Sequence, residues 1–345
     1  CDCDVRLESL GIAVDHLAFV LQSTHYPWCE NRVQSGPFLA GWFAGFPLEG
    51  GPHAEFTEAT DSESTAECSI VPFEIPDTSY EGDDEEESTS WEQGEAIAAA
   101  FFTRVQEDLE ANKDEIVEWH AQGIAPEEKI ACVQALDILQ DVIDWSYLSR
   151  PGFAERARDD NWYQLRNPES PCENPQCKLE VQREGARIAL MHLGLVVQSA
   201  RNKSKGGLQN VTEAFLRGWF FRFPLSGGPH AEITKYPLPN GQVEIRCYIH
   251  PGFAMNHSGG HGPLEIEASS DHGENVASTF RDRILRDLRA HEEEIVEWHH
   301  NGISPENRIP YVMALKILQE SLRKHQEDPP PDFYPSIGEA RESMQ

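Results

Sequence analysis

Two histidine–glutamate pairs are the residues whose types and spacing most directly suggest chemistry. His53 and Glu55 follow a Gly-Gly-Pro sequence, and His230 and Glu232 follow the same three residues 177 positions later. On a β-strand, residues i and i+2 point to one face, so each pair would place an imidazole beside a carboxylate. Such a pair can ligate a divalent, zinc-like metal, or act as a general base with its orienting partner.

A metal site needs further ligands, and histidines predicted on helices are the candidates. His120 and His299 each end a Glu-Ile-Val-Glu-Trp-His sequence, and His16 or His192 would be alternative donors. The predicted metal ligands are therefore His53, Glu55 and His120, with His230, Glu232 and His299 as the second set. A structural interpretation competes with this one, because a histidine after two glycines can bond to the backbone as a strand begins. On that interpretation no cofactor is expected.

Cysteines and further histidines offer weaker metal sites. Cys1, Cys3, Cys172 and Cys177 would supply four thiolates for structural zinc, although their spacing is looser than in a usual zinc knuckle. His257 and His261 lie in an insertion, 252–263, that only the second half of the chain carries. The other four cysteines are isolated and are predicted to be ordinary buried thiols. The chain contains no phosphate-binding glycine loop, no Gly-x-Ser-x-Gly and no His-Glu-x-x-His.

The sequence repeats itself. Phe38–Leu48 (FLAGWFAGFPL) matches Phe215–Leu225 (FLRGWFFRFPL), and three further blocks recur in the same order at nearly the same offset. This regularity predicts duplication and divergence of a module of roughly 150 residues. The predicted organisation is a strongly acidic first module at 1–148, a polar, proline-containing linker at 149–176, a second module at 177–327 with the insertion 252–263, and a proline-rich tail at 328–345.

Comparing the two copies predicts the local structure. In Phe38–Phe46 the shared large residues fall on one arc of a helix and the differing positions on the other, so this segment is predicted to be a helix that Pro47 ends. Alternating strand formers predict two strands per module, at 53–57 and 67–75, then at 230–235 and 242–249. Helices are expected at 94–109, at 114–122 and after Pro126, with an acidic, solvated loop at 77–90. The predicted fold class is α+β, a tandem duplication of a helix-rich module with a small antiparallel β-sheet.

Charge limits the partners. The formal net charge is −31, and residues 1–150 contain 32 Asp and Glu against 6 Lys and Arg. This field repels nucleic-acid phosphates and favours a basic protein partner, although solubility alone would also explain it. No apolar run approaches the roughly 18 residues of a membrane span. We therefore expect a cytoplasmic protein with no membrane span, with a lipid anchor on Cys1 as the alternative.

These observations favour a non-catalytic tandem-repeat interaction protein whose acidic surface meets a basic protein partner. The alternative is a metal-dependent hydrolase that uses a His/Glu site repeated in each module. An acidic mimic of nucleic acid is a third, weaker hypothesis. The sequence leaves the oligomeric state open.

Overall fold

The computed structural model describes residues 3–25, 33–46, 48–57, 67–73, 84–143, 179–204, 209–252 and 264–327. The chain divides into two compact units, with the described residues of 3–143 and 325–327 in the first and those of 179–324 in the second. Each unit combines helices with one two-stranded antiparallel sheet, which agrees with the predicted α+β class. The predicted linker and tail lie outside the described residues.

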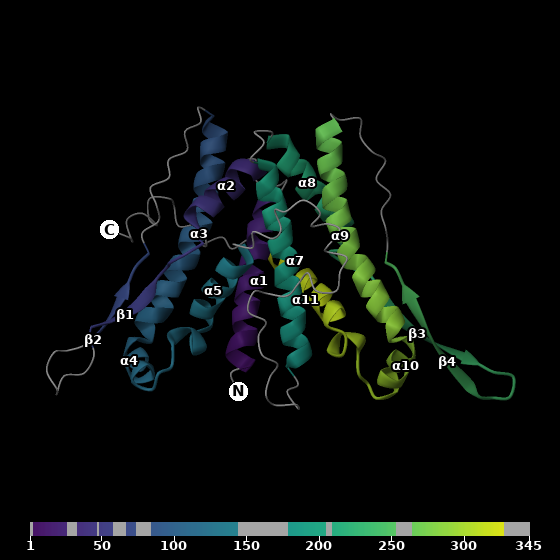
Figure 1. The fold of residues 1–345 in the computed structure, drawn as a ribbon. Helices are drawn as coiled ribbons and strands as arrows, with labels where there is room; N and C mark the ends of the chain where they lie inside the picture. Colours follow the sequence, from purple (N-terminus) through teal and green to yellow (C-terminus); the bar gives the residue numbers. More distant parts are fainter. Residues whose placement is uncertain are drawn as a thin grey trace. The chain divides into compact units, whose positions relative to one another are not determined.

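Helices form the core of the first unit (Figure 1). α1 (Cys3–His25) contains the most apolar run of the sequence, and α2 (Ser35–Gly45) confirms the helix predicted before Pro47. α2 packs along α3 (Glu85–Ala111), and α1 packs against α5 (Ala131–Ile143). Large side chains from α1, α2 and α3 are completely buried between these helices, which is what the predicted apolar arc of α2 requires.

The hairpin of the first unit consists of β1 (His53–Thr57) and β2 (Glu67–Val71), with His53 opposite Val71. β2 ends earlier than predicted because Pro72 cannot donate a ladder hydrogen bond. α4 (Lys113–Ala121) packs against β2 and is followed by Gly123, whose φ of +72° is typical of the residue after a helix C-terminus.

Two predictions for the helices of the first unit were wrong. The acidic loop predicted at 77–90 is helical from Glu85, because the Asp84 side chain accepts a hydrogen bond from the backbone N–H of Glu86 (2.9 Å). The carboxylates that follow Asp84 occupy the first turn, where the positive end of the helix dipole stabilises them. In addition, Pro126–Glu128 forms a separate 3₁₀ turn, η1, and α5 begins only at Ala131.

The second unit has the same order of elements. Its helices are α7 (Glu180–Ser204), α8 (Gln209–Arg222), α9 (Leu264–Ala290), α10 (Glu292–His300), the 3₁₀ turn η2 (Pro305–Asn307) and α11 (Pro310–Glu327). Its hairpin, β3 (His230–Pro237) and β4 (Val243–His250), is longer than the first. The turn between these strands has φ +79° at Gly241 and a 2.7 Å hydrogen bond from Leu238 N to Gln242 O.

Glycines bring two helix backbones into contact in each unit. A Cβ atom at Gly94 of α3 would overlap the backbone oxygen of Phe38 in α2, and a Cβ at Gly41 would overlap that of Trp91. Gly273 and Gly218 make the corresponding contacts between α9 and α8. Only a residue without a side chain permits this approach, so these glycines set the distance between the helices.

Candidate functional site

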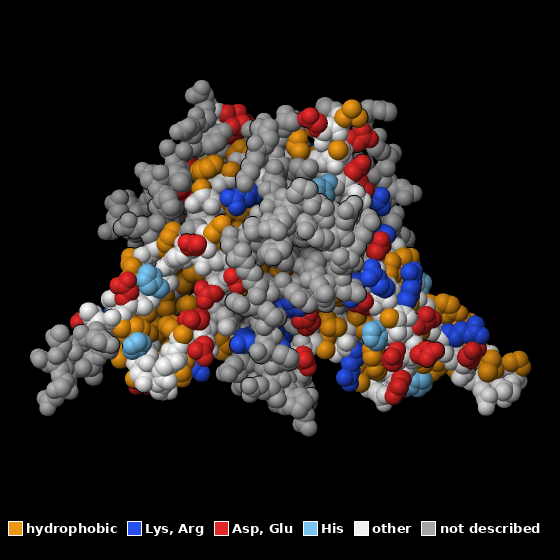
Figure 2. All heavy atoms as spheres, viewed as in Figure 1, with side chains coloured by type: hydrophobic (Ala, Val, Ile, Leu, Met, Phe, Trp, Pro, Cys, Tyr) orange, Lys and Arg blue, Asp and Glu red, His pale blue; other side chains and the backbone are white. Residues whose placement is uncertain are grey.

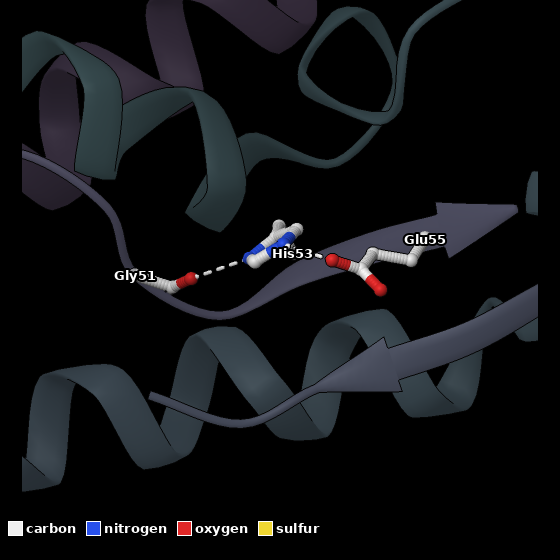
Figure 3. Close-up of polar contacts among 3 residues, drawn as sticks. All are labelled: Gly51, His53 and Glu55. Atoms are coloured by element: carbon white, nitrogen blue, oxygen red, sulfur yellow. Dashed lines mark hydrogen bonds and ion pairs between the residues drawn. The ribbon is translucent and has the colours of Figure 1, made fainter. Parts of the chain in front are cut away.

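The predicted pair of His53 and Glu55 is formed at the start of β1 (Figure 3). His53 Nδ1 lies 2.9 Å from the backbone oxygen of Gly51, and His53 Nε2 lies 3.4 Å from Glu55 Oε1. A carbonyl oxygen only accepts hydrogen bonds, so Nδ1 must carry the proton of the neutral ring. Nε2 is then the atom that can take up a proton or bind a metal, and protonation would strengthen its contact with Glu55.

The second unit arranges its pair differently. His230 Nδ1 again lies 2.9 Å from a glycine oxygen, that of Gly228, but Glu232 contacts His250 across the hairpin at 2.8 Å. The rings of His230 and His250 stack with centroids 5.1 Å apart. In the strand register His250 stands opposite His230, whereas Val71 stands opposite His53. His250 was not among the candidate residues, because only the pairing of the strands brings it opposite His230.

His120 lies on the other face of the first hairpin. Its ring stacks on Phe56 at a centroid distance of 3.6 Å and an angle of 10°. Phe56 alternates with His53 and Glu55 along β1, so its side chain points away from theirs. His299 is exposed at the end of α10, and its described ring contact is with His300. Within the described parts of the chain, no group of three or more His, Cys, Asp or Glu residues is placed to hold a metal ion.

The metal hypothesis remains a prediction with a direct test. If the His53–Glu55 pair belongs to a metal centre, protein purified without chelator should contain close to one equivalent of a transition metal per site. The double variant His53→Ala and Glu55→Ala should lose the metal equivalent bound by the first unit. The variant His299→Gln, at an exposed position, would show whether that residue contributes to metal binding in the second unit. Elemental analysis that finds only trace metal in the unmodified chain would contradict the hypothesis.

His16 and His192, the other candidate donors, are parts of the helical core. The indole N–H of Trp42 donates to His16 Nε2 at 3.2 Å, and that of Trp219 donates to His192 Nε2 at 3.1 Å. Burial lowers the pKa of both histidines to about 3, so both are neutral at physiological pH. Since the Nε2 lone pair of each accepts a hydrogen bond from an indole, these two histidines do not serve as metal ligands in this arrangement.

A pocket beside His53 adds residues that the sequence did not single out. Its volume is about 310 Å³, and it lies between the start of β1, the end of α3, η1 and α5. Leu109, Val133 and Leu136 form its apolar wall, whereas Asp137 and Glu127 bring carboxylates to it. These residues are far apart in the sequence and share no motif, so only the packing of helices against the hairpin brings them together.

The isolated cysteines behave as predicted where they are described. Cys68, Cys132 and Cys247 are free and buried, and burial raises the pKa of each thiol. Cys1, Cys172 and Cys177 of the predicted zinc site, and residues 253–263 of the histidine-bearing insertion, lie outside the described residues.

None of the described helices is both long enough and apolar enough to cross a membrane. Comparisons of the chain with protein-family models, with curated proteins and with solved structures gave no match.

Proposed function

We propose that this chain is a non-catalytic interaction protein, produced by tandem duplication of one α+β module, whose acidic first unit binds a partner protein with a basic surface. One observation carries the proposal. Buried contacts correspond between the two units, while two exposed glutamates near the end of the long helix α3 are replaced by arginines at the matching positions of α9.

The matching interior supports the duplication. Beyond the Trp–His hydrogen bonds and the glycine contacts, the side-chain amides of Gln140 and Gln319 donate to Gly50 O (2.6 Å) and Gly227 O (2.8 Å). Likewise, the hydroxyls of Ser35 and Thr212 donate to the backbone oxygens of Thr24 and Ala200 in the preceding helix. Polar contacts of this kind depend on precise geometry. Their recurrence at sequence offsets of 176 to 179 is expected if both units descend from one module.

The exposed surfaces differ in charge at two matching positions. Glu107 and Glu110 near the end of α3 correspond to Arg286 and Arg289 of α9, and all four are exposed. On the face in Figure 2, basic side chains are few over β1, β2 and α4, and more frequent over α9, α10 and the β3–β4 hairpin. Conserving the interior while reversing the charge at such exposed positions changes which partners a module attracts and leaves its fold intact.

Opposite charge chiefly accelerates encounter and excludes wrong partners, and salt weakens both effects. We therefore expect partner binding to depend strongly on ionic strength. The test uses the full chain as bait in cell extract at about 50 mM and at about 500 mM salt. Attraction between exposed charges acts at the lower concentration and is largely screened at the higher one. Any salt-sensitive partner is then purified and its affinity for the full chain is measured by calorimetry.

Charge-reversal variants locate the binding surface. The double variant Glu107→Arg and Glu110→Arg, which copies the second unit, should weaken binding about tenfold, because like charges now face the partner. The matched control, Arg286→Glu with Arg289→Glu, changes the second unit by the same amount of charge and should leave binding almost unchanged. The proposal is wrong if no salt-sensitive partner is captured, or if both double variants weaken binding equally.

A further inference from the structure

The pocket beside His53 has an apolar wall and an anionic rim. Its volume of about 310 Å³ lies at the lower end of the range for small-ligand pockets. Gln140 of α5 donates a 2.6 Å hydrogen bond to Gly50 O and so holds the segment before β1 against this helix. A Cβ at Gly51, where φ is +136°, would strike the Leu136 side chain, so the backbone lies directly on this wall.

Two carboxylates, those of Asp137 and Glu127, lie at the rim of the pocket. Among the residues that the structure describes, neither Asp137 nor Glu127 forms an ion pair. Partial burial, followed by the nearby charges of Glu127 and Asp141, raises the pKa of Asp137 to about 6. An incoming cation would relieve this repulsion, because it favours the ionised form of all three carboxyls.

The second unit differs from the first at one carboxylate of this rim. Leu136 and Gln140 of α5 correspond to Leu315 and Gln319 of α11, which keep their places beside the second glycine pair. Asp137, however, corresponds to Lys316, so the cation there belongs to the protein itself. Glu127 and Asp141 correspond to Glu306 and Glu320, so one of the three carboxylates is exchanged for a cation in the second unit.

We infer that the pocket of the first unit takes a lysine or arginine side chain of the partner, with the aliphatic stem on Leu136 and Val133 and the cationic head beside Asp137 and Glu127. This inference rests on the proposed function and names the chemistry of its contact. Long basic side chains bury their methylene groups on apolar surface while the charge stays at a polar edge, which is the arrangement that the pocket offers.

The experiment is a titration of the full chain with Nα-acetyl-lysine methylamide, followed by methyl NMR of labelled Leu and Val residues. The neutral control is Nα-acetyl-norleucine methylamide, which has the same unbranched carbon chain without the ammonium group. We expect the lysine compound to shift the Leu109, Val133 and Leu136 methyl signals with a dissociation constant of ~1 mM, and the norleucine compound to bind at least about tenfold more weakly.

Two substitutions test the role of charge. Asp137→Lys should abolish the response of the pocket methyl groups to the lysine compound, and Asp137→Asn should weaken it while preserving the fold. Lys316→Asp should create a new response at Leu315 in the second unit. Binding should also strengthen as the pH rises through about 6. His53 on β1, Glu127 on η1 and Asp141 on α5 are the titratable groups that face or adjoin Asp137, and α3 contributes only Leu109 to the pocket.

The outcomes separate this inference from the proposed function. Equal shifts from the lysine and norleucine compounds, or no shifts from either, overturn the inference. The inference also fails if a captured partner binds the Glu107→Arg and Glu110→Arg double variant more weakly but binds the Asp137→Lys variant with unchanged affinity. In that case the proposed function stands. If the lysine compound binds as expected but no salt-sensitive partner is captured, the pocket stands and the proposed function fails.

Discussion

Replacing Gly94 with alanine should lower the free energy of unfolding by about 2 kcal/mol, although alanine is the better helix former. The new methyl group would overlap the backbone oxygen of Phe38, and neither backbone can move aside as a flexible side chain would. α2 and α3 must therefore separate, which loosens the contacts of Phe38 and Trp42 in the core. Urea denaturation followed by circular dichroism measures the loss.

Gly11→Ala is the matched control for this prediction. Gly11 lies within α1, and apart from its chain neighbours and the nearby backbone of the helix itself, no atom of the described residues lies within 4 Å of the position that its Cβ would take. Alanine should therefore raise stability there by up to about 1 kcal/mol, since only helix propensity changes. Gly273→Ala should repeat the effect of Gly94→Ala, because Gly273 meets Phe215 in the same way. If Gly94→Ala stabilised the protein as Gly11→Ala does, the close helix contact would be disproved.

Acid should destabilise the protein through His16 and His192 from about pH 6.5 downward. Both have a pKa of about 3 in the folded chain because of burial, against 6.5 as the ordinary value. The unfolded chain thus binds more protons between these limits. The stability that each neutral histidine provides is complete above pH 6.5 and is lost as the pH falls toward 3. Within this window each histidine should contribute a slope of about 1.4 kcal/mol per pH unit.

Removing one Trp–His pair isolates this contribution. The double variant His192→Leu and Trp219→Phe removes both polar partners together, so neither is left buried without a hydrogen bond. Its stability should fall at neutral pH because the new side chains leave space, but its slope between pH 4 and pH 6 should be smaller by about 1.4 kcal/mol per pH unit. The control His299→Gln removes an exposed histidine and should keep the original slope. An unchanged slope in the double variant would show that His192 is not held neutral by the fold.

Features that depend on neighbouring residues could be predicted from the sequence. The helix at Phe38–Phe46, the strand at 53–57 and the glycine after α4 follow from periodicity and from backbone preferences. The contact of His53 with Glu55 also follows, because residues two apart on a strand share a face. The start of α3 was missed because a run of carboxylates is typical of loops, and here Asp84 caps a helix.

The tertiary structure decided what each candidate residue meets. The sequence could identify His16, His53 and His120 as recurring in both halves of the chain. It could not show that His16 accepts a hydrogen bond from an indole, that His53 lies beside a carboxylate, or that His120 stacks on a phenyl ring. The opposition of His250 to His230, and the meeting of His53 with Asp137 at one pocket, likewise depend on strand pairing and on helix packing. Such contacts join residues far apart in the chain, and no local pattern specifies them. The His–Glu pairs that suggested chemistry thus came from the sequence, and the different surroundings of each pair came from the fold.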